Sequence, residues 1–245
     1  MKQYLSRLVM VASLVLVGCA TSPMANPKDP WEPMNRKVAS FNDTIDDKVL
    51  KPVATGYRNV VPELIQTGVR NVFNNLADMW STVNSALQLK PAHTVESLGR
   101  VVVNTVFGIY GIFDVATYLK LERHPEDFGQ TLGYWGVPNG PYLVLPLFGP
   151  STLRDGASMP VDFAVSPSQY INDIPTRNQV FALRLVSKRA ELLKSGRMLE
   201  EASIDKYSFS RDAFLQYRRS QIYDGNPPDE EDSNDDPSAN PAPAK

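Results

Sequence analysis

The sequence predicts an all-α domain built mainly from amphipathic helices. Apolar residues recur every three or four positions over several long stretches, which is the period of a helix, and no convincing two-residue alternation is present. One stretch, from Val101 to Leu119, is apolar on most sides and carries a single charged residue, Asp114. A helix of that kind has to be buried by protein or by lipid, because its polar face is too narrow for a surface helix in water.

The chain begins with the features of a bacterial lipoprotein signal. A short basic region precedes an apolar run from Leu8 to Val17, and Cys19 follows closely. In such signals the peptide, here residues 1–18, is removed and the cysteine receives the lipid anchor. The alternative is an ordinary secretory peptide in which the cysteine is incidental. No Asp follows Cys19, which favours the outer membrane, and residues 19–33 are expected to hold the lipidated cysteine and a Pro-rich tether.

The first helices are delimited by proline and by capping residues. A helix is expected from Met34 to about Val49, ending before Pro52, because proline lacks the amide donor that a helix interior requires. A second helix should run from Pro62 to about Leu87, with an apolar stripe along one face. Thr94 can cap a third helix that leads into the apolar run.

The C-terminal half is expected to hold two further helices. The segment from Ser158 to Pro175 contains three prolines and is predicted to be irregular. Thr176 is an expected N-cap for a helix that stops at Gly196, and a last helix covers about Ser210 to Ile222. Residues 224–245 are acidic, Pro-rich and without large apolar side chains, so a disordered tail is expected there.

The apolar run also carries a stripe of small and polar residues. Plotted at 100° per residue, these side chains share one arc of the helix, and the bulky apolar residues occupy the rest. The stripe either borders an internal polar path or packs against a neighbouring helix. Its members are Asn104, Gly108, Gly111 and Asp114.

A turn-rich segment that is unusually apolar follows the run. Aromatic and aliphatic residues alternate with glycine and proline between residues 129 and 150, and a short hairpin arm can form from Tyr142 to Leu147. Loops normally face water, so this composition favours contact with lipid. Glycine tolerates backbone angles closed to other residues, and four glycines are therefore predicted to act as gating hinges; the alternative is that they serve only close packing. They are Gly129, Gly133, Gly136 and Gly140.

Composition and motifs argue against an enzyme, a metalloprotein and a nucleic-acid-binding protein. Outside the signal and the tail the chain is close to neutral and has no large basic patch. The two histidines, His93 and His124, are not in a metal-ligand spacing, and the sequence has no nucleophile elbow, phosphate-binding glycine loop or dinucleotide fingerprint. No catalytic residue, metal or cofactor is expected.

Several blocks of sequence carry a resemblance to a known family. They are DPWEPMNR at residues 29–36, KPVA at 51–54, EDFGQTLG at 126–133 and LRD at 153–155. Together with the glycines and prolines between them, these blocks resemble the MlaA/VacJ family of outer-membrane lipoproteins. The likeness covers nearly all of the helical domain expected at residues 34–223.

The resemblance implies a ring-like bundle of amphipathic helices around an amphipathic channel, lying in the inner leaflet of the outer membrane. Such a channel would remove mislocalised phospholipids from the outer leaflet and so maintain lipid asymmetry. The implied partners are phospholipid, an outer-membrane trimeric porin and a soluble periplasmic lipid carrier. Two alternatives remain: a scaffold lipoprotein without a lipid path, and a lipid-cleaving enzyme, which would need a nucleophile–base pair.

Overall fold

The structure is a computed structural model that describes residues 26–202 and 204–228. The expected signal peptide, Cys19 and the tail from residue 229 lie outside the described residues. The all-α prediction is confirmed. The helical elements in chain order are α2 (Glu32–Ile45), the π-helical turn η1 (Asp46–Leu50), α3 (Lys51–Val60), α4 (Glu63–Leu87), α5 (Pro91–Val106), α6 (Val115–Tyr118), α7 (Phe128–Tyr134), α8 (Leu153–Val165), the 3-10 turn η2 (Pro167–Tyr170), α9 (Ile174–Ala202) and α10 (Lys206–Ile222).

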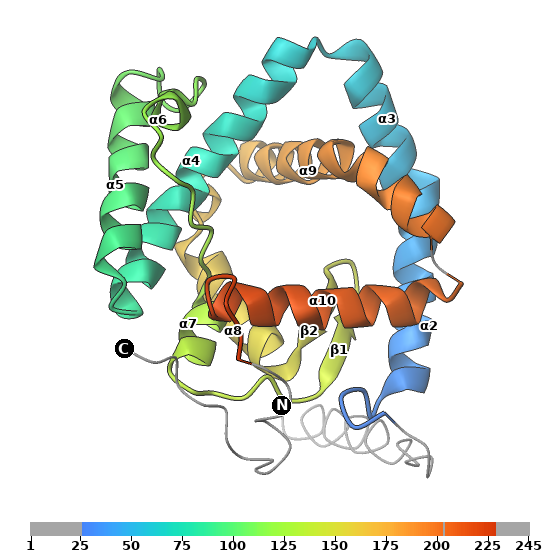
Figure 1. Cartoon of the computed structure of the whole chain (residues 1–245). Helices are drawn as coiled ribbons and strands as arrows, with labels where there is room; N and C mark the ends of the chain where they lie inside the picture. Colours follow the sequence, from blue (N-terminus) through green and yellow to red (C-terminus); the bar gives the residue numbers. More distant parts are fainter. Residues whose placement is uncertain (1–25, 203, 229–245) are drawn as a thin grey trace, which may run out of the picture.

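The helices are arranged as a ring (Figure 1). One side is formed by α4 and the opposite side by α2 and α3, while α9 and α10 cross between them. α5 packs against α4, and α9 contacts both α3 and α4. The expected hairpin is present as strands β1 (Tyr142–Leu145) and β2 (Gly149–Thr152), paired antiparallel beside α8 and α10.

The first helix does not end before Pro52, as the sequence predicted. α2, η1 and α3 follow one another without a break from Glu32 to Val60, and Pro52 lies in the first turn of α3. The π turn shifts the hydrogen bonding by one residue, so that the Lys51 amide donates to the carbonyl of Asp46. That shift starts a new α segment in which the amide missing from proline is not required.

The apolar run is not a single helix either. α5 ends at Val106, and Ile109, Tyr110 and Gly111 adopt positive φ angles of 52°, 55° and 89°, which turn the chain back on itself. Asp114 then caps the short α6 by accepting a hydrogen bond from the Thr117 amide. A search of the described residues for a membrane-spanning helix finds none that is both long and apolar enough.

Two C-terminal expectations are also wrong. Ser158 to Val165 is helical, as part of α8, and Pro160 is accommodated inside that helix. α9 is capped by Asp173, whose carboxylate accepts bonds from the amide and hydroxyl of Thr176, and it continues through Gly196. Both helices pack against other elements, and tertiary packing outweighs local helix-breaking tendencies.

The two ends of the described chain meet in a polar joint. Asp29 is fully buried and accepts hydrogen bonds from Tyr207 Oη at 2.6 Å and from Asn35 Nδ2 at 2.8 Å. Asn35 also bonds the backbone of β1 through the Tyr142 carbonyl and the Val144 amide. Arg36 joins α2 to Asp205, the N-cap of α10, at 2.7 Å. The DPWEPMNR block therefore connects the start of the ring to its last helix.

Burial in this ring is the reverse of that in a globular protein in water. No residue of the predicted apolar stripe of α4 is buried: Ile65, Val83 and Leu87 are exposed, and the others are half-buried. Large apolar side chains are also highly exposed where α3 meets α4 and around α6, with Val60 at 82% and Tyr118 at 85%. Proteins in water bury such side chains and expose charged ones. The residues buried in α4 are all small or polar: Gly68, Asn75, Asp78, Ser81, Asn84 and Ser85.

Candidate functional site

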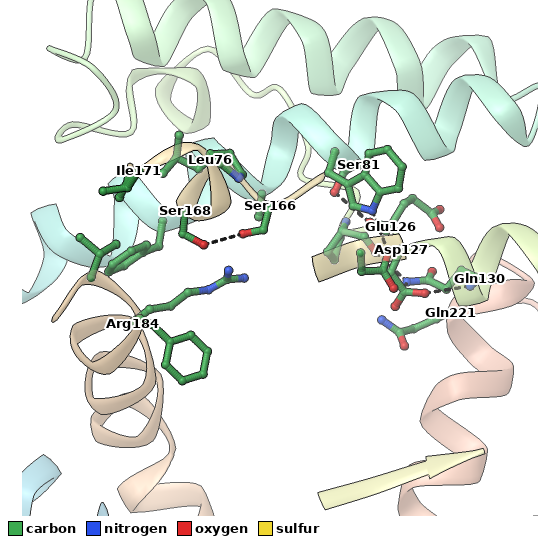
Figure 2. Close-up of a pocket in the computed structure, with 18 residues that line it drawn as sticks. Leu76, Ser81, Glu126, Asp127, Gln130, Ser166, Ser168, Ile171, Arg184 and Gln221 are labelled. Carbon is green, nitrogen blue, oxygen red and sulfur yellow. Dashed lines mark hydrogen bonds between the residues drawn. The ribbon is translucent and has the colours of Figure 1, made fainter. Parts of the chain in front are cut away.

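A polar-rimmed pocket of about 410 Å³ lies on the inner side of the ring (Figure 2). Its walls are formed by α4, α7, α8, η2, α9 and α10, so that residues distant in sequence converge there. Figure 2 shows Arg184 extending from α9 into the pocket, with Asp127, Gln130 and Gln221 across from it. Apolar side chains of α4 and α9 complete the lining, among them Phe73, Leu76 and Phe181.

One wall is held by an ion cluster centred on Arg218. Its guanidinium bonds both carboxylate oxygens of Asp127 at 2.6 Å and one oxygen of Asp155 at 2.8 Å. Burial alone would raise the pKa of Asp127, but the pairing with Arg218 outweighs it and holds that pKa below its usual range. The cluster joins α10 to the N-cap of α7 and to the first turn of α8.

Glu126 is also committed to partners within the wall. It is buried and accepts a hydrogen bond from Gln88 Nε2 at 2.9 Å, and Lys90 Nζ lies 3.4 Å from its other oxygen. Burial raises the pKa of Glu126, and the bonds from Gln88 and Lys90 oppose that shift. Neither Glu126 nor Asp127 is thus a free charge at the pocket.

Asp162 and Arg184 differ from these residues. Asp162 Oδ1 accepts bonds from Trp80 Nε1 at 2.8 Å and from the Phe128 amide at 2.9 Å, both neutral donors, and burial raises its pKa. Arg184 retains surface toward the space inside the ring, yet the surrounding walls desolvate it and lower its pKa. Within the described part of the chain, neither side chain has an oppositely charged partner at salt-bridge distance.

The predicted small-polar stripe lies outside this pocket, between α5, α6 and α4. Asn104 donates to Asp114 at 3.0 Å and accepts from the Ala116 amide at 2.8 Å. Arg100, only 3% exposed, pairs with Asp114 at 2.9 Å. A Cβ on Gly111 would lie 2.7 Å from that of Asn75, so α4 and the turn approach closely there. A Cβ on Gly108 would meet the Phe113 carbonyl. These contacts hold the α5–α6 turn against α4.

Asp114 of that stripe borders a cavity. A second, mainly apolar cavity of about 870 Å³ lies between the first half of α4 and the segment from Ile112 to Tyr118. Asp114 and Thr117 supply its polar edge. Asn104 is held by hydrogen bonds within the α5–α6 turn, and Gly108 and Gly111 lie where other residues approach closely. A role of the whole stripe in lining a channel stays a prediction.

The four predicted hinge glycines fall into two groups. Gly129 and Gly133 lie within α7, where an added Cβ would come within 2.6 Å of Arg218 Nη2 and of Arg154 Nη1 respectively. Those two positions are occupied by glycine for close packing. Gly136 and Gly140 lie in the following loop with φ angles of +89° and +64°, a region that favours glycine. Gating by this loop stays a prediction.

One group of described residues has the composition of a metal site. Ligand atoms of His93, Glu126 and Asp224 lie within 4.8 Å of one another. The ammonium of Lys90 lies 2.6 Å from Asp224 and 3.4 Å from Glu126, so the positive charge that a metal would supply is already present. His93 stacks on His124 with ring centroids 3.8 Å apart, and burial lowers its pKa.

The charged residues Arg184 and Asp162 of the pocket were not predicted as site residues. Arg184 lies within the helix that was expected from Thr176 to Gly196, and Asp162 lies in the segment that was predicted to be irregular. The one signal that could have found part of the site is the EDFGQTLG block, which supplies Glu126, Asp127 and Gln130.

Comparison with known proteins agrees with this architecture. The family described as MlaA lipoprotein matches residues 27–221. Several relatives carry the name "Intermembrane phospholipid transport system lipoprotein MlaA". The relative from Shigella flexneri is 36% identical over 222 residues, which cover 88% of this chain and 87% of the relative. The relative from Haemophilus influenzae is 32% identical over 225 residues, which cover 88% and 89%.

A solved structure is similar in three dimensions as well. It is described as "Structural basis for maintenance of bacterial outer membrane lipid asymmetry" and superimposes with a TM-score of 0.70 at 33% identity. The match covers 79% of this chain and 98% of the other. Because the family match spans most of the chain and the relatives exceed 30% identity over nearly their whole length, this chain belongs to the MlaA lipoprotein family.

Proposed function

We propose that this chain is an outer-membrane lipoprotein whose ring offers phospholipids a polar path out of the leaflet in which they are misplaced. The observation that carries the proposal is the inverted burial, with small and polar residues inside the walls and large apolar side chains outside. An apolar exterior is stable against acyl chains, and polar groups inside can receive a headgroup. Phospholipid transport and lipid asymmetry, which the relatives' names describe, fit that division.

The anchor and the partners follow from the same reading. Cys19 would hold the ring in the periplasm-facing leaflet of the outer membrane. The exposed apolar surface around α6 and the α3–α4 corner would then lie among acyl chains. A trimeric porin beside the ring and a soluble periplasmic carrier below it complete the proposal, since a lipid that leaves the ring needs an acceptor in water.

The two alternatives are less well supported. A scaffold without a lipid path gives no reason for unpaired charges inside the ring at Arg184 and Asp162. A lipid-cleaving enzyme needs an activated nucleophile. Over the described ranges, 26–202 and 204–228, neither histidine is hydrogen-bonded to a serine or threonine hydroxyl; His124 bonds Glu96 and His93 stacks on His124.

Lipid exposure in cells tests the function directly. Cells that lack the protein should show more phospholipid at the outer surface, measured by labelling with a reagent that does not cross the membrane. The full-length gene should reverse the change, and a Cys19→Ala gene should not. Unchanged surface phospholipid in the deletion strain would refute the proposed function.

A further inference from the structure

Arg184 is an unusual arginine for the interior of this ring. Buried arginines of the ring are paired, such as Arg218 with Asp127 and Asp155, and Arg100 with Asp78 and Asp114. Arg184 is exposed instead, and it projects into the pocket without a carboxylate at salt-bridge distance in the part of the chain that the structure describes. Its guanidinium is therefore available to an anionic group that enters the pocket. The guanidinium presents forked donors that match a phosphate.

Asp162 is the corresponding unpaired anion of the same pocket. Its two hydrogen bonds, from Trp80 Nε1 and the Phe128 amide, fix one carboxylate oxygen but do not neutralise its charge. The bond to Phe128 places Asp162 next to the residue that follows Asp127, and both acids line the pocket. Figure 2 shows Asp127 across the pocket from Arg184. A carboxylate held in this way can accept hydrogen bonds from an ammonium group.

The remaining acids and bases of the pocket are already committed. Asp127 is neutralised by Arg218, and Glu126 by Lys90 and Gln88. Among residues 26–202 and 204–228, the pocket therefore presents one positive and one negative group without an oppositely charged partner, from α9 and α8 respectively. A ligand that satisfies both must itself carry both charges.

We propose that this pocket is a headgroup subsite for zwitterionic phospholipids, in which Arg184 binds the phosphodiester and Asp162 binds a primary ammonium such as that of ethanolamine. The inference rests on the proposed function. A volume of about 410 Å³ lies in the range of small-molecule sites, roughly 300–1,000 Å³. The apolar lining from Phe73, Leu76 and Phe181 leaves a surface along which the acyl chains can lie.

The same charges disfavour an anionic headgroup. Phosphatidylglycerol would satisfy Arg184 but would offer Asp162 only a neutral glycerol hydroxyl in place of an ammonium group. Replacing a hydrogen bond between two charged groups by one from a neutral donor is expected to lower affinity by about tenfold. The wild-type protein should therefore prefer phosphatidylethanolamine over phosphatidylglycerol by about that factor.

Competition between the two lipids tests the subsite. Full-length lipidated protein in detergent would be incubated with vesicles of equal amounts of phosphatidylethanolamine and phosphatidylglycerol, and the bound lipids counted by native mass spectrometry. Asp162→Asn keeps the acceptor for Trp80 and Phe128 but removes the charge. It should abolish the preference while total binding remains. Arg184→Gln should reduce binding of both lipids about tenfold.

Two matched controls separate the subsite from general charge effects. Lys188→Gln removes a charge from the same helix at an exposed pair with Glu191, and Asp47→Asn removes an exposed carboxylate from η1. Both should bind the lipids as the wild type does.

The possible contrary results are distinct. Equal binding of the two lipids by the wild type would refute the subsite without any variant, and so would a preference that survives Asp162→Asn. Absence of any bound phospholipid on the wild type would instead count against the proposed function.

Discussion

Replacing Arg218 with methionine should destabilise the ring more than any single surface change. Met fills much of the volume of the arginine stem but cannot bond Asp127 or Asp155. Asp155 keeps a second cation, because Arg154 Nη2 lies 2.9 Å from it. Asp127 has no ion pair other than that with Arg218 among the described residues, and its side chain keeps 37% of its surface at the pocket. We therefore attribute most of the loss to Asp127.

Breaking a buried ion pair on one side typically costs about 3–5 kcal/mol, and the exposure of Asp127 places this case near about 3 kcal/mol. For a domain of this size, that loss lowers the melting temperature by about 6–12 °C. The assay is thermal unfolding in one fixed detergent, followed by circular dichroism. Lys188→Met, which removes an exposed pair, should change the free energy of unfolding by less than about 1 kcal/mol.

A second variant checks the cause of the loss. Combining Arg218→Met with Asp127→Asn removes the uncompensated charge and should recover part of the lost stability. A melting temperature within about 2 °C of the wild type for Arg218→Met alone would show that the cluster does not hold α7, α8 and α10 together.

Three further predictions follow from the described contacts and the signal. Gly133→Ala should lower the free energy of unfolding by about 1–3 kcal/mol, because the added Cβ would lie 2.6 Å from Arg154 Nη1. Gly136→Ala has open space around the added Cβ and should lower it by only about 1 kcal/mol, through backbone strain. Equal melting curves for the two variants would contradict this explanation. Burial alone would raise the pKa of Asp114, but hydrogen bonds from Thr117 and Arg100 outweigh burial and lower that pKa in the folded protein. The ionised Asp114 therefore contributes its full stabilisation of the fold above the pKa of an unfolded Asp, near about 3.9. That contribution is lost as the pH falls through the pKa of Asp114 in the folded protein. The stability difference between wild type and Asp114→Asn should accordingly be constant near neutral pH and shrink below about pH 4; a difference that instead disappears on raising the pH would reverse that assignment. Cys19→Ala should leave the chain unprocessed or detached from the membrane, measured by fractionation and by mass; processing and membrane attachment like the wild type would refute the lipoprotein signal.

Local sequence signals predicted a helical chain, but they misplaced several helix limits and did not predict the environment of the helices. The limits of α4 followed from Pro62 and from the residues after Leu87, and the structure confirms them within one residue. Which face of α4 is buried could not be derived in the same way, because amphipathicity identifies two faces but not the solvent outside them. The break after Val106 depends on positive φ at Ile109 and Tyr110, and only the neighbouring glycines hint at it.

The pocket was less predictable than the fold, for a related reason. Arg184 and Lys188 lie one turn apart on α9 and look alike in the sequence, yet one enters the ring and the other pairs with Glu191 outside the pocket. Whether a charge has a partner depends on helices that approach from elsewhere in the chain. Asp162 is a case in point, since its donors come from α4 and α7.

The polar joint between the two ends of the ring also constrains when the molecule can close. Asp29 bonds Tyr207, and Arg36 bonds Asp205, across separations of 178 and 169 residues. Contacts so distant in sequence form late and slowly, because the entropy of loop closure is lost before they contribute. Until α10 has been synthesised and docked, the N-terminal helices cannot close the ring, and both their polar and their apolar faces are unprotected. A chain of this design is therefore vulnerable to aggregation and proteolysis up to the final stage of its folding.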